Sequence, residues 1–322
     1  MDNSGKNQTQ KRRAIIDVGS NSVKLLIAEV ADGEVMPIIH EGEQTRLGRG
    51  VFETGRLELE AIADTARVVS AFGAKAKAAG AASVRVLATS AAREAANADE
   101  LVAAISAGGL ELEIIDGLTE AELVLRGVRS LSDLAEGPLA IIDVGGGSTE
   151  LLVADDTALR LQHSFALGTV RWLESFPVSE TPTEAERAKL AQALDDFLDE
   201  QVTPKLGGLP LPNTLIGAGG TPVFLARIFL ERSDLAADEV EALRLSLPEV
   251  QSLTQRLWKM PLAARRELSG LPANRADVIL FGAAIYEAVM MCCGFGELRP
   301  TLRGVRYGAL LAGGTSSTSS QT

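Results

Sequence analysis

Two aspartates begin glycine- and serine-rich turns at equivalent places in a repeated segment. Residues 14–30, AIIDVGSNSVKLLIAEV, return as residues 140–156, AIIDVGGGSTELLVADD, with ten of the seventeen positions identical and Asp17 aligned with Asp143. Each copy is typical of an apolar strand, a turn and a second apolar strand. Backbone N–H groups in such a turn can bind anionic oxygens, and the aspartate can hold a divalent cation beside them. The repeat therefore predicts two phosphate-binding hairpins that face each other across a cleft.

The overall composition is that of an ordinary soluble globular protein with an excess of acidic residues. The 322 residues are 46% hydrophobic and 23% charged, and the net charge is −12, from 43 acidic and 31 basic residues. A chain of this length exceeds what one core usually supports, so we expect two domains. General nucleic-acid binding needs a positive surface, so we expect no nucleic-acid partner.

The scarcity of cysteine and histidine restricts the possible chemistry. Cys292 and Cys293 are adjacent in an apolar segment and are interpreted as core residues, because vicinal cysteines make a poor disulfide framework. His40 and His163 lie in no motif and are assigned no role. A zinc centre or a Ser-His-Asp triad is hard to assemble from them, so we expect carboxylates, arginine and backbone to do the chemistry. The apolar runs are too short for a signal peptide or membrane span, which predicts a cytoplasmic protein with no membrane partner.

Strand and helix patterns alternate along both halves of the chain, which indicates an α/β fold. Residues 131–138, LSDLAEGP, have the composition of a linker and directly precede the second copy of the hairpin. We therefore expect a disordered tail at 1–13, one domain at 14–136, a second at 137–313, and a disordered tail at 314–322.

A third glycine-rich turn, GAGGT at residues 217–221, follows the two repeated turns at 17–22 and 143–150. One such turn is weak evidence, but three in this order resemble the two phosphate segments and the nucleotide segment of the actin, sugar-kinase and Hsp70 superfamily. The resemblance implies an α/β fold of two related actin-like (ribonuclease H-like) domains with an interdomain cleft.

Further segments narrow the resemblance to the Ppx/GppA family of exopolyphosphatases and guanosine pentaphosphate phosphatases. These segments span residues 14–311 and include, besides the turns, ATSAAREA at 88–95, GLTEAELVLRGV at 117–128 and RADVILFGAAI at 275–285. The chain then resembles a short form that lacks the C-terminal helical domains of longer members.

The resemblance implies that Glu120 is the base that activates the attacking water. The family places its base in a G-x-E-E-A-x-L segment, which here reads GLTEAEL, with Thr119 at the first glutamate position and Glu120 at the second. The T-x-x-E spacing from Thr119 to Glu122 is also that of a capping box, which predicts Glu120 in the first turn of a helix. The helix dipole favours the ionised carboxylate there, as a base requires. The alternative is that Glu120 is simply a favourable first-turn acid.

The same resemblance implies an arginine clamp and a magnesium site. Arg93 is similar to the family arginine that holds the terminal phosphate, a task suited to a planar guanidinium. Asp143, supported by Glu150, resembles the Mg²⁺-associated carboxylate, since phosphoanhydride cleavage needs cationic neutralisation of the transferred group. Asp17 either assists the metal, orients water or caps its own turn.

The turns supply the expected phosphate donors, which are Asn21, Ser22, Gly145, Gly146, Gly147 and Ser148. Residues 219–221 either contact a nucleotide, as in the superfamily, or shape the cleft wall, which we favour. Arg303 and Arg306 lie where the family has a basic segment, but Val305 and Tyr307 depart from it, so substrate contact there stays open.

These features favour hydrolysis of terminal phosphoanhydride bonds, with inorganic polyphosphate as the leading substrate because repeated anion-binding turns suit a chain of phosphates. Guanosine pentaphosphate is the second candidate substrate. The sequence leaves two other functions open, an ATP-dependent kinase of the same superfamily and a non-catalytic protein that binds polyphosphate or nucleotides. The family implies a homodimer, although the late apolar helices would serve equally well in the core of a monomer.

Overall fold

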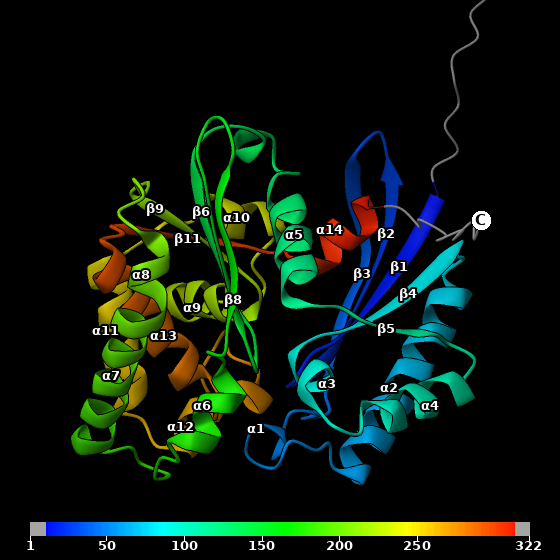
Figure 1. Cartoon of the computed structure of the whole chain (residues 1–322), viewed down its shortest axis with the longest axis horizontal. Helices are drawn as coiled ribbons and strands as arrows, with labels where there is room; N and C mark the ends of the chain where they lie inside the picture. The colour runs from blue at the N-terminus through cyan, green and yellow to red at the C-terminus, as the bar shows by residue number, and fades with distance from the viewer. Residues whose placement is uncertain (1–10, 313–322) are drawn as a thin grey trace, which may run out of the picture.

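The computed structural model describes residues 11–312, and within them two α/β domains lie side by side (Figure 1). Each domain is built on one mixed sheet. The first sheet has the strand order β3-β2-β1-β4-β5, and the second has the order β10-β11-β9-β6-β7-β8. The first contains β1 (Lys11–Val18), β2 (Ser22–Ala31), β3 (Glu34–Gln44), β4 (Ser83–Ala88) and β5 (Leu112–Ile114). The second contains β6 (Leu139–Val144), β7 (Thr149–Ala154), β8 (Leu159–Phe165), β9 (Thr214–Ala218), β10 (Leu245–Ser246) and β11 (Glu297–Thr301).

The repeat seen in the sequence is a repeat of topology. In each sheet, three antiparallel strands in chain order are followed by two further strands that run parallel to the first, so β1 to β5 correspond to β6, β7, β8, β9 and β11. The register of the two hairpins also corresponds. Asp17 lies opposite Lys24 in the β1–β2 pair, and Asp143 lies opposite Glu150 in the β6–β7 pair.

The outer helices bury the apolar residues of each sheet in a separate core. The first domain has α1 (Val51–Thr54), α2 (Leu59–Ala78), α3 (Ser90–Glu94) and α4 (Ala98–Ala107), with α2 packed on β1 and β2. The second domain has α6 (Thr169–Ser175), α7 (Glu184–Phe197), a π-helical turn η2 (Leu198–Val202), α8 (Thr203–Leu206), α9 (Gly220–Leu230), α10 (Ala237–Ala242), α11 (Leu247–Trp258), α12 (Leu262–Arg266), a 3₁₀ turn η3 (Ala273–Arg275) and α13 (Ile279–Cys293). A short 3₁₀ turn, η1 (Ser132–Leu134), lies between the domains in sequence. No helix within residues 11–312 is long and apolar enough to cross a membrane.

Two helices, α5 (Gly117–Val128) and α14 (Val305–Leu311), lie between the sheets and join them (Figure 1). Their apolar side chains share one core with residues of both sheets, including Leu26 and Leu152. The helices approach so closely that a Cβ on Gly308 would overlap the carbonyl oxygen of Leu123. This tight packing couples the two domains through a continuous apolar seam.

The structure departs from the expected domain limits at two places. β1 begins at Lys11, inside the expected 1–13 tail, because Lys11 pairs with Val30 of β2. α14 belongs by sequence to the expected 137–313 domain, but it packs on α5 and against β1, β2 and β3. The division at residue 136 therefore assigns α14 to the second domain, although the helix packs against the sheet of the first. Residues 1–10 and 313–322, most of the two expected tails, lie outside the described residues.

Candidate active site

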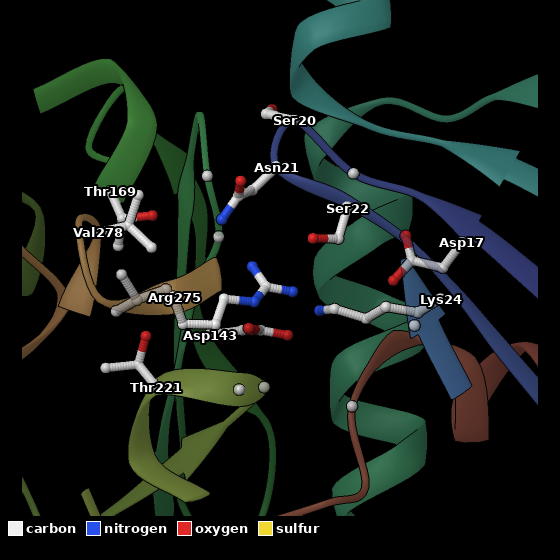
Figure 2. Close-up of a pocket in the computed structure, with 18 of the residues that line it drawn as sticks. Asp17, Ser20, Asn21, Ser22, Lys24, Asp143, Thr169, Thr221, Arg275 and Val278 are labelled. Carbon is white, nitrogen blue, oxygen red and sulfur yellow. The ribbon is translucent and has the colours of Figure 1, made fainter. Parts of the chain in front are cut away.

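A cavity of about 490 Å³ lies where the two hairpin turns face each other (Figure 2). Nearly every residue that the sequence predicts for the site lines it: Asp17, Asn21, Ser22, Glu120, Asp143, Gly145, Gly146, Gly147, Ser148 and Glu150. The exception is Arg93, which contacts Glu120 from outside the cavity lining. Residues from β1, β2, α5, β6 and β7 thus converge on one space, as the repeat predicts.

The two turns have the same backbone geometry. The Gly19 N–H donates to the Ser22 carbonyl at 3.0 Å, and the Gly145 N–H donates to the Ser148 carbonyl at 2.9 Å. In the first turn the hydroxyls of Ser20 and Ser22 and the Asn21 Nδ2 group are buried without a hydrogen-bond partner among the described residues. Buried polar groups are normally paired, so these three groups are available to an anion in the cavity. Sequence reasoning named Asn21 and Ser22 but missed Ser20.

Glu120 lies in the first turn of α5, as predicted, but the predicted cap is wrong. Asp116 is the N-cap, and its carboxylate accepts a hydrogen bond from the Thr119 N–H at 2.7 Å. The helix therefore begins at Gly117, before the predicted capping box at Thr119. Aspartate is a strong N-cap residue, and it satisfies an otherwise unpaired backbone donor. Glu120 is 7% exposed and faces the cavity from the helix start.

Arg93 holds Glu120 in place. Its Nη1 group donates to Glu120 Oε2 at 3.1 Å and to the Ile115 carbonyl at 2.9 Å. Arg93 is not among the residues that line the cavity. In this arrangement it orients the carboxylate, and a direct clamp on the terminal phosphate remains a prediction.

Of the three carboxylates beside the cavity, Glu120 and Glu150 are buried and Asp143 is half-buried. Burial raises the pKa of Glu120 well above its ordinary value, the nearby Glu150 raises it further, and Arg93 opposes the shift. Burial and Asp143 raise the pKa of Glu150 to about 7, although Ser164 donates a hydrogen bond to it at 2.7 Å. Burial also raises the pKa of Asp143. A cation near these groups would stabilise their ionised forms.

The donor set fits Mg²⁺ only in combination with a phosphorylated substrate. Within residues 11–312, no group of three or more His, Cys, Asp or Glu side chains is arranged to hold a metal ion. Asp143 and Glu150 nevertheless lie opposite each other on adjacent strands beside the cavity. Mg²⁺ is commonly held by one or two carboxylates together with water and phosphate oxygens, which matches this pair. Asp17 lies instead across from Lys24 in the first hairpin.

Three half-buried cations also line the cavity; the sequence left substrate contact by Arg306 open and assigned no role to the other two. They are Lys24 on β2, Arg275 on η3 and Arg306 on α14, and none forms a salt bridge with another described residue. Figure 2 shows Lys24 and Arg275 pointing toward one another from opposite domains. Burial lowers the pKa of Lys24 and of Arg306, and lowers that of Arg275 to about 10. Alignment of the repeats could have identified Lys24, because it is the counterpart of Glu150.

His40, which received no role from the sequence, also lines the cavity. The side chain is exposed, but partial desolvation against the cavity wall, with the neighbouring Arg306 and Lys24, lowers the pKa of the imidazole below its ordinary value. The imidazole is therefore neutral at physiological pH and adds a polar wall without adding charge.

The third glycine-rich turn packs closely against the carboxylate of Asp143. Gly219 has a φ of +89°, and a Cβ at this position would lie 2.5 Å from Asp143 Oδ1. The turn also starts α9, whose first residues line the cavity. This packing is consistent with a role in shaping the cleft wall, the interpretation that the sequence favours over nucleotide contact.

Two ion pairs connect the two domains near the cavity. Arg171 on α6 donates through Nη2 to both carboxylate oxygens of Glu94 at 2.7 Å, and through Nε to the Gly147 carbonyl at 2.7 Å. Arg46 binds Asp277 at 2.8 Å from the first domain to the second. These contacts bridge the two domains beside the cavity.

Comparison with known proteins agrees with this site. Residues 26–313 match the sequence profile of the Ppx/GppA phosphatase family. The chain belongs to this family. Exopolyphosphatase 2 of Mycobacterium tuberculosis H37Rv is 34% identical over 290 residues, which are 86% of this chain and 89% of the relative. A guanosine-5′-triphosphate,3′-diphosphate pyrophosphatase of Aeromonas hydrophila is 30% identical over 93% of this chain, which spans 58% of that protein.

Solved structures confirm the predicted fold class of this Ppx/GppA protein. An exopolyphosphatase from Cytophaga hutchinsonii superimposes with a TM-score of 0.86 and is 25% identical, with 94% of this chain and 98% of that chain covered. The Aquifex aeolicus family member gives a TM-score of 0.77 at 29% identity, with 94% and 97% covered. The family resemblance and the two-domain actin-like architecture inferred from the sequence are both confirmed.

Proposed function

We propose that this protein hydrolyses the terminal phosphoanhydride bond of inorganic polyphosphate and releases orthophosphate. The observation that carries the proposal is a set of three half-buried cations in the same cavity as the two anion-binding turns, none with a salt-bridge partner in residues 11–312: Lys24, Arg275 and Arg306. A single terminal phosphate needs only the turns. Further cations beside them suit a ligand that carries negative charge along its length. The 34% identity to an exopolyphosphatase supports the same substrate.

The proposed reaction places Glu120 as the general base. Its carboxylate takes a proton from a water molecule while the water oxygen forms a bond to the terminal phosphorus. The bridging P–O bond breaks, and its electron pair remains on the shortened polyphosphate. Arg93 fixes the orientation of the carboxylate through the 3.1 Å contact. General-base catalysis contributes roughly 10²–10⁴-fold in rate, so the reaction depends strongly on this one group.

Mg²⁺ is part of the proposal. Asp143 and Glu150 would hold it, and it would neutralise negative charge on the transferred phosphoryl group. The first turn, with Asn21 and Ser22, and the second, with residues 145–148, would donate hydrogen bonds to the terminal phosphate. A homodimer in the cytoplasm also belongs to the proposal, on the family resemblance. Analytical ultracentrifugation would measure the oligomeric state.

Guanosine pentaphosphate is the second candidate substrate. Apolar side chains, among them Phe224 and Val278, line the cavity on the second-domain side near Arg275 and would accept a base. The identity to the Aeromonas hydrophila pyrophosphatase supports this candidate.

Parallel assays of phosphate release test the proposal. The purified protein with Mg²⁺ is given polyphosphate of defined length, guanosine pentaphosphate, or ATP with a sugar acceptor. We expect the highest kcat/KM for polyphosphate and no release in EDTA. Faster release from guanosine pentaphosphate would overturn the substrate assignment. Transfer from ATP to the acceptor would favour a kinase, and binding of polyphosphate without release would favour a non-catalytic protein.

A matched pair of variants on α5 tests the base. Glu120→Gln removes the buried carboxylate and is expected to lower kcat at least about 100-fold. Glu122→Gln makes the same change on the same helix, where the side chain is exposed and pairs with Arg126, and is expected to retain activity. Full activity of Glu120→Gln would remove the mechanism and leave the family assignment intact.

A further inference from the structure

Gln44, the last residue of β3, joins the first phosphate-binding turn to the opposite domain. Its side-chain nitrogen Nε2 is 2.9 Å from Asn21 Oδ1 and 2.8 Å from the backbone carbonyl oxygen of Asn274 in η3. Asn21 belongs to the turn between β1 and β2, and Asn274 precedes the cavity cation Arg275. One amide group thus contacts both walls of the cleft.

The hydrogen-bond partners fix which way the side-chain amides of Gln44 and Asn21 are turned. A backbone carbonyl can only accept, so the Gln44 atom that contacts Asn274 must be its NH₂ group. The same NH₂ group contacts Asn21, so the Asn21 atom that faces it must be the acceptor Oδ1. The Asn21 NH₂ group is therefore turned away from Gln44, where it is buried with no partner among the described residues. Figure 2 shows the Asn21 side chain directed into the cavity.

We propose that Gln44 is a positioning residue that presents the Asn21 N–H donor to phosphate only while η3 is docked. This inference rests on the proposed function, in which Asn21 binds a phosphate oxygen. When η3 is docked, Asn274 uses one hydrogen of the Gln44 amide and Asn21 Oδ1 uses the other. When η3 moves away, Gln44 is free to rotate, and Asn21 can then turn its oxygen toward the anion.

Docking of η3 would also favour the binding of a polyanion, because of two neighbouring arginines. Arg46, two residues after Gln44, binds Asp277 at 2.8 Å and ties the same two segments together. Arg275 on η3 enters the cavity when η3 is docked. Docking of η3 therefore brings the Arg275 guanidinium and the correctly oriented Asn21 amide to the ligand at the same time. Gln44 links the two, because it contacts both segments.

Gln44→Glu is the sharpest test because it keeps the shape and removes the donor. A carboxylate cannot donate to Asn274, and it would draw the Asn21 NH₂ group toward itself, which leaves Oδ1 facing the ligand. Binding is measured by calorimetry with Mg²⁺ and imidodiphosphate, whose P–N–P bridge resists hydrolysis. Loss of a hydrogen bond to a charged group predicts a Kd increase of roughly tenfold or more. Gln192→Glu on α7 is the matched control, since that exposed glutamine also donates to one side chain, and its Kd should equal that of the wild type.

A double-mutant cycle separates positioning from general structural damage. If Gln44 acts through Asn21, Gln44→Glu adds little to the Kd of an Asn21→Ala variant, and hydrolysis shows mainly a raised KM. An unchanged Kd in Gln44→Glu, or an effect fully additive with Asn21→Ala, would overturn the inference. Wild-type protein that binds imidodiphosphate but releases no phosphate from polyphosphate would overturn only the proposed function. Wild-type protein that binds no imidodiphosphate would overturn this inference, whatever its hydrolytic activity.

Discussion

Lys24 and Glu150 occupy the same position in the two copies of one hairpin, and each lies directly across its strand pair from an aspartate. The first copy therefore places Asp17 opposite a cation, and the second places Asp143 opposite another carboxylate. This one difference makes the first hairpin suited to anion binding and the second suited to a divalent cation. The duplicated hairpins are alike in backbone geometry, but the Asp17–Lys24 pair has no net charge whereas the ionised Asp143–Glu150 pair carries two negative charges.

Replacement of Lys24 should weaken the binding of polyphosphate. Lys24→Met keeps the apolar stem and removes a half-buried cation that has no ion-pair partner in residues 11–312. We expect KM for polyphosphate to rise about tenfold, with a reduced dependence of KM on salt concentration. Steady-state kinetics between low and moderate salt would measure both effects. Lys77→Met on the exposed face of α2 is the control, and an equal effect there would contradict the assignment.

Removal of the Glu150 charge should stabilise the metal-free protein at alkaline pH. Its folded pKa of about 7 lies above the ordinary value of 4.5, so the folded state binds more protons than the unfolded state between these values. The contribution of Glu150 to the free energy of unfolding is therefore most favourable below about pH 4.5 and is lost as pH rises through about 7. Glu150→Gln should gain on the order of 1–3 kcal/mol over wild type at pH 8, and much less at pH 5.

Denaturant unfolding in EDTA at both pH values would measure this difference. The same variant should lose most hydrolytic activity, because it lacks one of the two proposed Mg²⁺ ligands. An equal gain in stability at pH 5 and pH 8 would show that the effect comes from packing and not from the buried charge.

The acid limb of the pH–rate profile should depend on Arg93. Burial and Glu150 raise the pKa of the Glu120 carboxyl, and Arg93 lowers it. A base must be ionised, so kcat/KM should fall as pH drops below this raised pKa. Arg93→Met removes the cation and should move the acid limb to higher pH, with a lower plateau.

Arg126→Met on the same helix as Glu120 is the control for this shift. Arg126 pairs with the exposed Glu122 at 3.2 Å, and its replacement should leave the profile unchanged. If Arg93→Met lowers the plateau and leaves the acid limb in place, Arg93 acts on the substrate and not through the pKa of Glu120.

The sequence by itself determined the architecture and most of the chemical groups. A strand-turn-strand pattern is local, and two copies of it predicted the paired hairpins whose turns face one cavity. Asp143, Glu150 and the turn residues were recognisable for this reason. Glu120 was recognisable through its motif, although its helix cap was not, because Asp116 and Thr119 are both acceptable caps and only the backbone path selects between them.

Only the tertiary structure decided how distant elements meet. Lys24, Arg275 and Arg306 come from β2, η3 and α14 and line one cavity. α14 returns to pack on α5 and the first sheet, which places Arg306 there. The local sequence around each of these cations does not show that the three side chains line one cavity. The contact of Gln44 with Asn274 likewise joins segments 230 residues apart. Local residue patterns reflect backbone preference and one-sided burial, whereas the charge of a cavity depends on which surfaces pack together across the whole chain.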